Sequence, residues 1–144
     1  MKKGIDYVGV SVNYFCHDGK GRFLMQKRSH NCRDEWDKWD TGGGGVEVGD
    51  TLEETLRKEI KEEYCTDVLG FEFLGYGDVF REHEEIKTHW LSMKFKALVD
   101  PAKVANGEPH KFSEIKWFTF DALPPDSELH SQLPKFFRDY KDRL

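Results

Sequence analysis

Three glutamates in one short segment of the chain have the chemistry to bind a divalent metal ion. Glu59, Glu62 and Glu63 stand at positions i, i+3 and i+4, so a helix would place their carboxylates on one patch of its surface. Like charges this close repel one another, and more strongly where water is excluded, so the cluster needs a compensating cation. Mg²⁺ is the natural choice because it takes hard oxygen ligands and shares its coordination shell with water and phosphates, with Mn²⁺ as the alternative.

The same segment carries the signals of a helix with one face toward a core. Thr51 and Glu54 form a capping box, which predicts a helix start at about Leu52. Glu63 projects close to the apolar stripe of this helix, where a carboxylate must be paired, protonated or metal-bound. A solvated acidic face is the competing interpretation. The stripe consists of Leu52, Leu56, Ile60 and Tyr64.

A run of four glycines, Gly42 to Gly45, precedes this helix. Helix propensity gives no reason for such a run, because glycine lowers helix stability and favours turns. Glycines do allow the backbone to approach a ligand or another element closely. The run therefore favours a functional site over a solvated acidic face.

Residues 44–66 together resemble the Nudix box, whose family pattern is G-x5-E-x7-R-E-U-x-E-E-x-G-U, with U an aliphatic residue. Gly44 matches the first glycine, and residues 58–63 read Lys-Glu-Ile-Lys-Glu-Glu against the central R-E-U-x-E-E. Cys65 replaces the family's glycine and Thr66 its aliphatic residue. Asp50 and Lys58 replace a Glu and an Arg that usually form a structural ion pair, which keeps the charges but loses the bidentate geometry. None of the departures affects the three glutamates.

The resemblance implies an α/β/α sandwich around a mixed sheet, with the box as a loop-helix-loop motif, and hydrolysis of a nucleoside diphosphate linked to a group X. Glu59, Glu62 and Glu63, with a backbone carbonyl near Gly43, would hold Mg²⁺ ions that bridge diphosphate oxygens. A water activated by the metal or by Glu59 would then attack phosphorus in line. Metal dependence should be close to absolute, because water is a poor nucleophile at neutral pH.

Length and composition fit a single domain spanning residues 1–144. The net charge of −5 and the acidic box suit metal-neutralised phosphates and argue against duplex nucleic acid as a partner. The three cysteines lack disulfide or zinc spacing, and the amino terminus resembles neither a signal nor a membrane segment, so a cytoplasmic protein is expected. A small-molecule nucleotide is the expected partner, and formation of a homodimer stays open.

The rest of the chain predicts strands around this helix and a closing helix. Arg28 ends one strand, where it would contact phosphate or remain a solvated charge. His17 to Gly21 reads as a hairpin turn, and Arg81 to Glu85 as a charged loop. An amphipathic helix is expected within residues 129–144. The strands are expected at residues 7–15, 23–27, 68–80, 88–98 and 114–120.

A second resemblance lies near the carboxyl end, in an E-P-x-K segment followed by E-x-x-W-F and L-P-P. Similar segments occur in Nudix proteins that cleave nucleoside triphosphates. Glu108, His110 and Glu114 are therefore candidates for an additional catalytic or substrate-binding group outside the box. Phe118 and Trp90 are candidates for stacking on the base, with core packing as the competing interpretation of Phe118.

These resemblances favour cleavage of a canonical or modified nucleoside triphosphate to nucleoside monophosphate and pyrophosphate. ADP-ribose or a nucleotide sugar is the alternative substrate. A diphosphate isomerase would want a cysteine where Gly42 and Gly43 stand, and a noncatalytic nucleotide sensor would be expected to lose metal-site carboxylates. A calcium module is disfavoured because Ca²⁺ loops space their ligands along an irregular segment.

Overall fold

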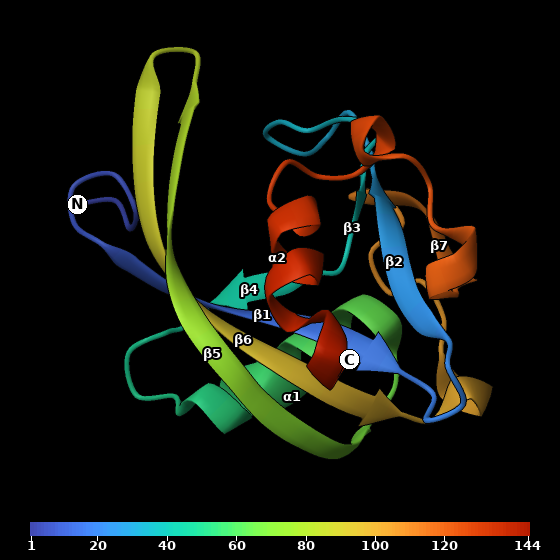
Figure 1. Ribbon diagram of the computed structural model, residues 1–144. Coiled ribbons are helices and arrows are strands. Elements are labelled where there is room, and N and C mark those ends of the chain that lie inside the picture. The colour runs from blue at the N-terminus through green and yellow to red at the C-terminus, as the bar shows by residue number, and fades with distance from the viewer.

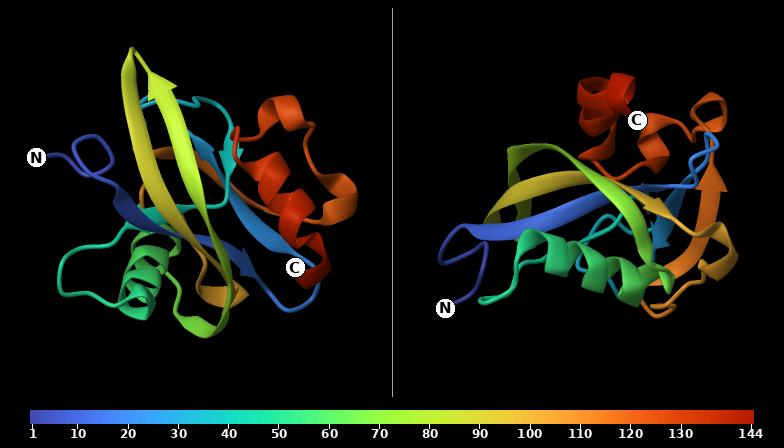
Figure 2. Two further views of the ribbon diagram at one scale, coloured as in Figure 1. Left: turned by 60° about the vertical axis from the view of Figure 1, so that its left-hand side comes forward. Right: turned by 90° about the horizontal axis from the view of Figure 1, so that it is seen from below.

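The computed structural model describes all residues 1–144 and shows a curved mixed sheet with one helix on each face (Figures 1 and 2). Helix α1 (Leu52–Tyr64) covers one face, and the shorter α2 (Leu133–Tyr140) lies over the other. This is the expected α/β/α arrangement. The strands are β1 (Gly9–His17), β2 (Phe23–Arg28), β3 (Trp39–Asp40), β4 (Gly43–Gly45), β5 (Val68–His83), β6 (Ile86–Val99) and β7 (Phe112–Phe118).

The sheet is built around β1, which has neighbours on both sides. The main order is β3-β2-β1-β6-β5, while β4 pairs with β1 and β7 pairs with β2. The pairing of β1 with β6 is parallel, and all others are antiparallel. Short 3-10 turns at Pro101–Lys103, Phe120–Ala122, Asp126–Glu128 and Lys141–Arg143 complete the chain. None of the helices has the length and apolar character needed to cross a membrane.

Side chains alternate along β1 and so divide the interior into two cores. Val12, Tyr14 and Cys16 face α1, where they join the apolar stripe of that helix. Phe15 points to the opposite face and packs beside Phe137 of α2, with ring centroids 6.5 Å apart. The remaining positions of that face, near the amino end of β1, are polar and leave space beside α2.

Helix α1 begins where the capping signal predicts. The Thr51 hydroxyl accepts a hydrogen bond from the Glu54 amide at 3.0 Å, and Leu52 is the first helical residue. At the other end Cys65 adopts the left-handed conformation with φ of 62°, although the family pattern has glycine there. A side chain in this conformation costs about 1 kcal/mol.

The predicted loop from Arg81 to Glu85 is wrong in its extent. Arg81 still belongs to β5, which pairs with β6 as far as His83 opposite Ile86. Only Glu84 and Glu85 form the turn, with φ of 50° and 67°, the left-handed geometry of a two-residue hairpin loop. A run of charged residues therefore continues a strand, and the hairpin projects beyond the body of the sheet (Figure 1).

The closing helix is also shorter than the predicted span, and Pro134 lies in its first turn. Proline lacks a backbone N–H and is favoured in the first turn of a helix, which agrees with the start of α2 at Leu133. Strand β7 starts at Phe112 and ends at Phe118, two residues earlier at each end than expected.

The turn between β1 and β2 is held by the carboxylate of Asp18. Asp18 accepts hydrogen bonds from the Lys20 amide at 2.7 Å, the Arg22 amide at 3.1 Å and Arg22 Nε at 2.8 Å. Burial alone would raise the pKa of Asp18, but these hydrogen bonds outweigh it and hold the pKa below its usual value. The predicted hairpin turn is thus stabilised by a local side chain.

Candidate active site

Glu63 is the most enclosed of the three helix carboxylates. Its side chain is buried, with 5% of the residue exposed, and it accepts a hydrogen bond from the Tyr14 hydroxyl of β1 and another from the Gly43 amide. Burial, followed by the charge of Glu108, raises the pKa of Glu63 well above its ordinary value. A nearby cation would favour the ionised form of this carboxylate.

Glu59 lies against the glycine strand, one turn before Glu63. A Cβ atom added at Gly44 would stand 2.2 Å from Glu59 Cδ, so the glutamate fits only because residue 44 has no side chain. Burial, and then the charge of Glu62, raises the pKa of Glu59. Glu62 itself is exposed. The three acids of the box thus differ in burial, from the exposed Glu62 through the half-buried Glu59 to the buried Glu63.

Gly42 is a second position where glycine is required. Its φ is 97°, a conformation that L side chains rarely adopt. A Cβ there would also approach Tyr14 to 2.8 Å and Glu63 Oε1 to 2.9 Å. The backbone of the glycine run is therefore in direct contact with the buried carboxylate.

The chemistry of this donor set fits Mg²⁺, although the side chains do not form a complete cage. No three His, Cys, Asp or Glu side chains converge closely enough to hold a metal ion. Mg²⁺ does not require such a cage, since it is commonly bound by one or two carboxylates with water and substrate phosphates in the remaining positions. A buried glutamate with a raised pKa, next to a second half-buried one, supplies the hard oxygen ligands that it prefers.

A cleft of about 480 Å³ opens beside Glu63, on the sheet face that α2 partly covers. Four residues singled out from the sequence line it: Arg28, Gly43, Glu63 and Trp90. The cleft runs from the glycine strand, across β1 and β6, toward β5 and α2. Its other lining residues include Ser11, Asn13, Gln26, Asp40, Arg81, Ser92, Lys94, Lys111, His130 and Phe136.

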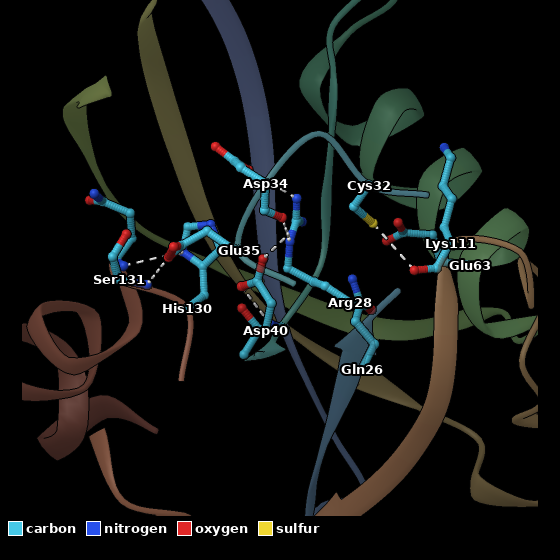
Figure 3. Close-up of polar contacts among 12 residues, drawn as sticks. Gln26, Arg28, Cys32, Asp34, Glu35, Asp40, Glu63, Lys111, His130 and Ser131 are labelled. Atoms are coloured by element: carbon cyan, nitrogen blue, oxygen red, sulfur yellow. Dashed lines mark hydrogen bonds and ion pairs between the residues drawn. The ribbon is translucent and has the colours of Figure 1, made fainter. Parts of the chain in front are cut away.

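Arg28 does not extend freely into this cleft. Its guanidinium lies 3.4 Å from Asp34 Oδ1 and 3.8 Å from Asp40 Oδ2, and its Nε donates to the Asp34 carbonyl at 3.1 Å (Figure 3). Arg81 of the projecting hairpin also donates to the Asp34 carboxylate. One carboxylate thus joins two arginines from different strands. Arg28 is thus a paired residue of the cleft wall and not a solvated charge, and its contact with phosphate stays a prediction.

Lys111 brings a positive charge to the acidic end of the cleft. Its Nζ lies 3.2 Å from Glu108 Oε2. Although burial lowers the pKa of Lys111, the hydrogen bond to Glu108 and the charges of Glu63 and Glu59 raise it overall. Figure 3 shows Lys111 and Glu63 side by side. Glu108, one of the candidates from the sequence, therefore influences the pKa values of Glu59 and Glu63 by its charge and holds Lys111 close to them.

Three other sequence candidates lie outside the cleft. Glu114 is exposed on β7, opposite Lys27 of β2. His110 is exposed in the preceding loop, where its carbonyl oxygen accepts hydrogen bonds from the loop of residues 29–38. Phe118 is 7% exposed and packs edge-on against Trp39 at 4.9 Å, so it belongs to the second core rather than to a stacking surface.

The sequence reasoning missed several cleft residues, among them Asn13, Ser92, Lys94 and Phe136. The first three alternate with apolar residues along β1 and β6, and such alternation is read as a strand with one face in water. Here that face forms the floor of the cleft. Phe136 lies in the predicted closing helix, and its ring also lines the cleft from α2.

The expected pair of Asp50 and Lys58 is present in the structure. Lys58 Nζ lies 3.5 Å from Asp50 Oδ2, and both side chains are more than a third exposed. The pair connects the segment before α1 to the middle of the helix, as the charges of the family pattern would require.

Comparison with known proteins agrees with this fold. The model of the NUDIX domain matches residues 8–140. Among solved structures, a MutT protein from Methanosarcina mazei Go1 superposes with a TM-score of 0.71 at 25% identity, over 95% of this chain and 96% of that one. A MutT NUDIX hydrolase from Burkholderia pseudomallei gives 0.70 at 24% identity, over 81% of this chain and 86% of that one. These similarities show that the chain shares their fold. The chain belongs to the Nudix family of hydrolases.

Curated relatives match over part of their length. The nucleoside triphosphatase NudI of Salmonella typhimurium is 35% identical over 69 residues, which are 48% of each chain. The NAD-capped RNA hydrolase NudC of Vibrio vulnificus is 33% identical over 86 residues, 57% of this chain and 29% of that protein. The NudC protein of Pseudomonas aeruginosa is 28% identical over 87 residues, 60% of this chain and 29% of that protein. The matches thus span between 29% and 48% of the length of these relatives.

Proposed function

We propose that this protein is a Mg²⁺-dependent hydrolase that cleaves a nucleoside triphosphate, canonical or modified, to nucleoside monophosphate and pyrophosphate. The observation that carries the proposal is the junction of Glu63 with the cleft. A buried carboxylate of raised pKa lies where the glycine backbone opens onto a cleft large enough for a nucleoside. The similarity to NudI, named as a nucleoside triphosphatase, favours the same substrate class.

The chain's own groups would divide the work between the two ends of the cleft. Glu59, Glu62 and Glu63, with the backbone near Gly43, would hold Mg²⁺, which when bound neutralises the diphosphate and makes water a better nucleophile. Glu59 would accept the proton of the attacking water. Lys111 would add positive charge beside the phosphates, close to the carboxylates that hold the metal.

The nucleoside would occupy the part of the cleft floored by β1 and β6. Trp90 and Phe136 line this part, and both offer aromatic surface to a base. Trp90 is itself packed against glycines, because a Cβ at Gly9 would stand 2.6 Å from its ring and one at Gly45 would stand 3.5 Å from it. Its position is therefore fixed by the sheet.

A substrate panel tests the proposal. The purified chain is incubated with Mg²⁺ and nucleoside triphosphates, oxidised triphosphates, ADP-ribose and nucleotide sugars. Pyrophosphate is measured directly, and orthophosphate is measured after added phosphatase. Pyrophosphate release from triphosphates that stops with a chelator is the expected result. Activity confined to ADP-ribose or sugar-linked diphosphates refutes the triphosphate assignment, and no hydrolysis with Mg²⁺ or Mn²⁺ refutes the enzyme and favours a nucleotide sensor.

A further inference from the structure

Lys94 on β6 is a half-buried lysine on the cleft floor that forms no ion pair. Its Nζ donates to Ser92 Oγ at 3.1 Å and lies 5.9 Å from the ring centroid of Phe136. Burial lowers the pKa of Lys94, because the surroundings disfavour the ammonium form. An ammonium has three donors, and here one of them is used.

Three other basic side chains of the cleft differ from Lys94 in this respect, whereas Arg33, which also lines the cleft and forms no ion pair, is exposed. Arg28 and Arg81 share the carboxylate of Asp34, and Lys111 is paired with Glu108. Their positive charges are offset within the protein. Lys94 therefore has hydrogen-bond donors free for a ligand in the cleft. Partial burial of its ammonium group costs free energy, and a hydrogen-bond acceptor on the ligand would offset this cost.

The contacts of Lys94 also determine the orientation of a neighbouring amide. Because Lys94 only donates, Ser92 accepts from it and is left to donate its own proton, which goes to Asn13 Oδ1 at 2.5 Å. Ser11 Oγ donates to the same oxygen at 3.0 Å. The Asn13 oxygen is thus occupied, and Asn13 Nδ2 faces the glycine strand, where a Cβ at Gly43 would stand 2.4 Å from it. Lys94 and Asn13 consequently offer the cleft donors and no acceptor.

These donors lie in a row that leads away from the metal-binding end. Gly43 of β4 is the register partner of Asn13 on β1, and Asn13 is the register partner of Lys94 on β6. Neighbouring strands are about 4.8 Å apart, so the row from Gly43 to Lys94 is about 10 Å long. Trp90 stands on the same strand and face as Lys94, four residues earlier. A nucleoside with its phosphates at Gly43 would extend along this row and bring its base to Lys94.

We propose that Lys94, with its two unused donors, forms a donor-only subsite that recognises the nucleobase and selects bases with a keto oxygen. Guanine, hypoxanthine, uracil and thymine present acceptors at the edge where adenine and cytosine present an amino group. An amino group facing Lys94 would leave two buried donors opposed and unpaired. The inference rests on the proposed function, because it takes the cleft to hold the nucleoside of the substrate.

Hydrolysis kinetics give the first test. The ratio kcat/KM is compared for GTP, ITP and UTP against ATP and CTP. The keto bases are expected to be favoured by about tenfold or more, the effect of one mismatched hydrogen-bonding pair. Lys94→Met should lower kcat/KM for the keto bases about tenfold and leave the amino bases within about twofold, thereby removing the preference. Lys87→Met is the matched control, since Lys87 is exposed on the same strand and outside the cleft.

A binding measurement separates this inference from the hydrolase proposal. GMP, UMP, AMP and CMP are titrated without metal into the wild-type protein and Lys94→Met, with NMR detection and a thermal melt to show that both are folded. Tighter binding of GMP and UMP that Lys94→Met abolishes supports the subsite even if no triphosphate is cleaved. Equal binding of all four, binding of none, or a preference that persists in Lys94→Met overturns it. Triphosphate hydrolysis without base preference would overturn the subsite and leave the hydrolase standing.

Discussion

Replacing Gly44 by alanine should displace the carboxylate of Glu59 while leaving the fold intact. The new Cβ would stand 2.2 Å from Glu59 Cδ and 2.5 Å from Oε2. Carbon atoms in contact are separated by about 3.5 Å or more, so the carboxylate must move by about 1.3 Å. The clashing atoms are the end of a flexible side chain, which can rotate away at little cost in stability. A misplacement of about 1 Å at a catalytic group lowers the rate by about two orders of magnitude.

The neighbouring glycine supplies the control for this prediction. A Cβ at Gly45 would meet only the Trp90 ring at 3.5 Å, an ordinary contact. Gly45→Ala should therefore keep turnover within a few-fold of wild type, while Gly44→Ala loses about a hundredfold in kcat with a melting temperature close to that of Gly45→Ala. Equal turnover of the two variants at saturating substrate and Mg²⁺ would refute the argument that Glu59 must lie against residue 44. Unfolding of Gly44→Ala alone would refute the claim that the side chain gives way.

Three further predictions concern charged groups. Glu63→Gln preserves the shape of the side chain and the acceptor for Tyr14 but removes an anionic ligand, so kcat at saturating Mg²⁺ should fall at least about a hundredfold. The control is Glu54→Gln, an exposed position on the same helix, which should not change kcat. Near-normal turnover of Glu63→Gln would exclude Glu63 from the metal site. Asp50→Ala and Lys58→Ala should show a coupling of about 0.5 kcal/mol in a double-mutant cycle of unfolding free energies, the usual size for a partly exposed pair at this distance, and strict additivity would mean that the two side chains do not interact. Folding lowers the pKa of Asp18, so the stabilisation from its carboxylate is present above the unfolded pKa of about 3.9 and is lost as pH falls through the folded pKa. Asp18→Asn should therefore lower the free energy of unfolding by about 1–3 kcal/mol at neutral pH and by less in acid. An equal loss at both pH values would contradict this origin.

Helix α1 could be predicted because its determinants are local in sequence. The Thr51 cap, the apolar stripe and the acids at 59, 62 and 63 each act within one or two turns, and the structure reproduces the start at Leu52. The end at Cys65 carries a conformational cost that the departure from glycine already indicated. The residues of the family pattern in this segment are also the ones that determine where the helix begins and ends.

The position of Phe118 could not be predicted in the same way. Strand β7 pairs with β2, so Phe118 stands opposite Phe23, and both side chains lie in the second core, beside α2. That pairing joins residues separated by nearly a hundred positions, and nothing within the segment from Phe112 to Phe118 specifies it. The alternation of the strand shows that some residues are buried, but the partner strand decides which core receives them.

The same limit applies to the polar residues of the cleft floor. Asn13 and Lys94 occupy the positions that a half-exposed strand gives to water, and alternation alone assigns them there. They become a site only because β1 and β6 lie side by side in parallel register and α2 approaches the same face. Their chemistry could be read from the sequence, whereas their proximity depends on the order of the strands.

The ion pairs of Arg28 and Arg81 hold the walls of the cleft in place but add no net charge to it. Asp34, with its side chain 10% exposed, links Arg28 of β2 to Arg81 of the projecting hairpin, and Asp40 lies on the other side of Arg28. Two arginines and two aspartates cancel in charge, and a desolvated network of this kind adds little net stability. What it does contribute is position, because it ties the loop of residues 29–38 and the hairpin across the cleft. Among the cleft's basic side chains, Arg33 and Lys94 form no ion pair, and Lys94 is the half-buried one on the floor, which is why the proposed base recognition is assigned to it.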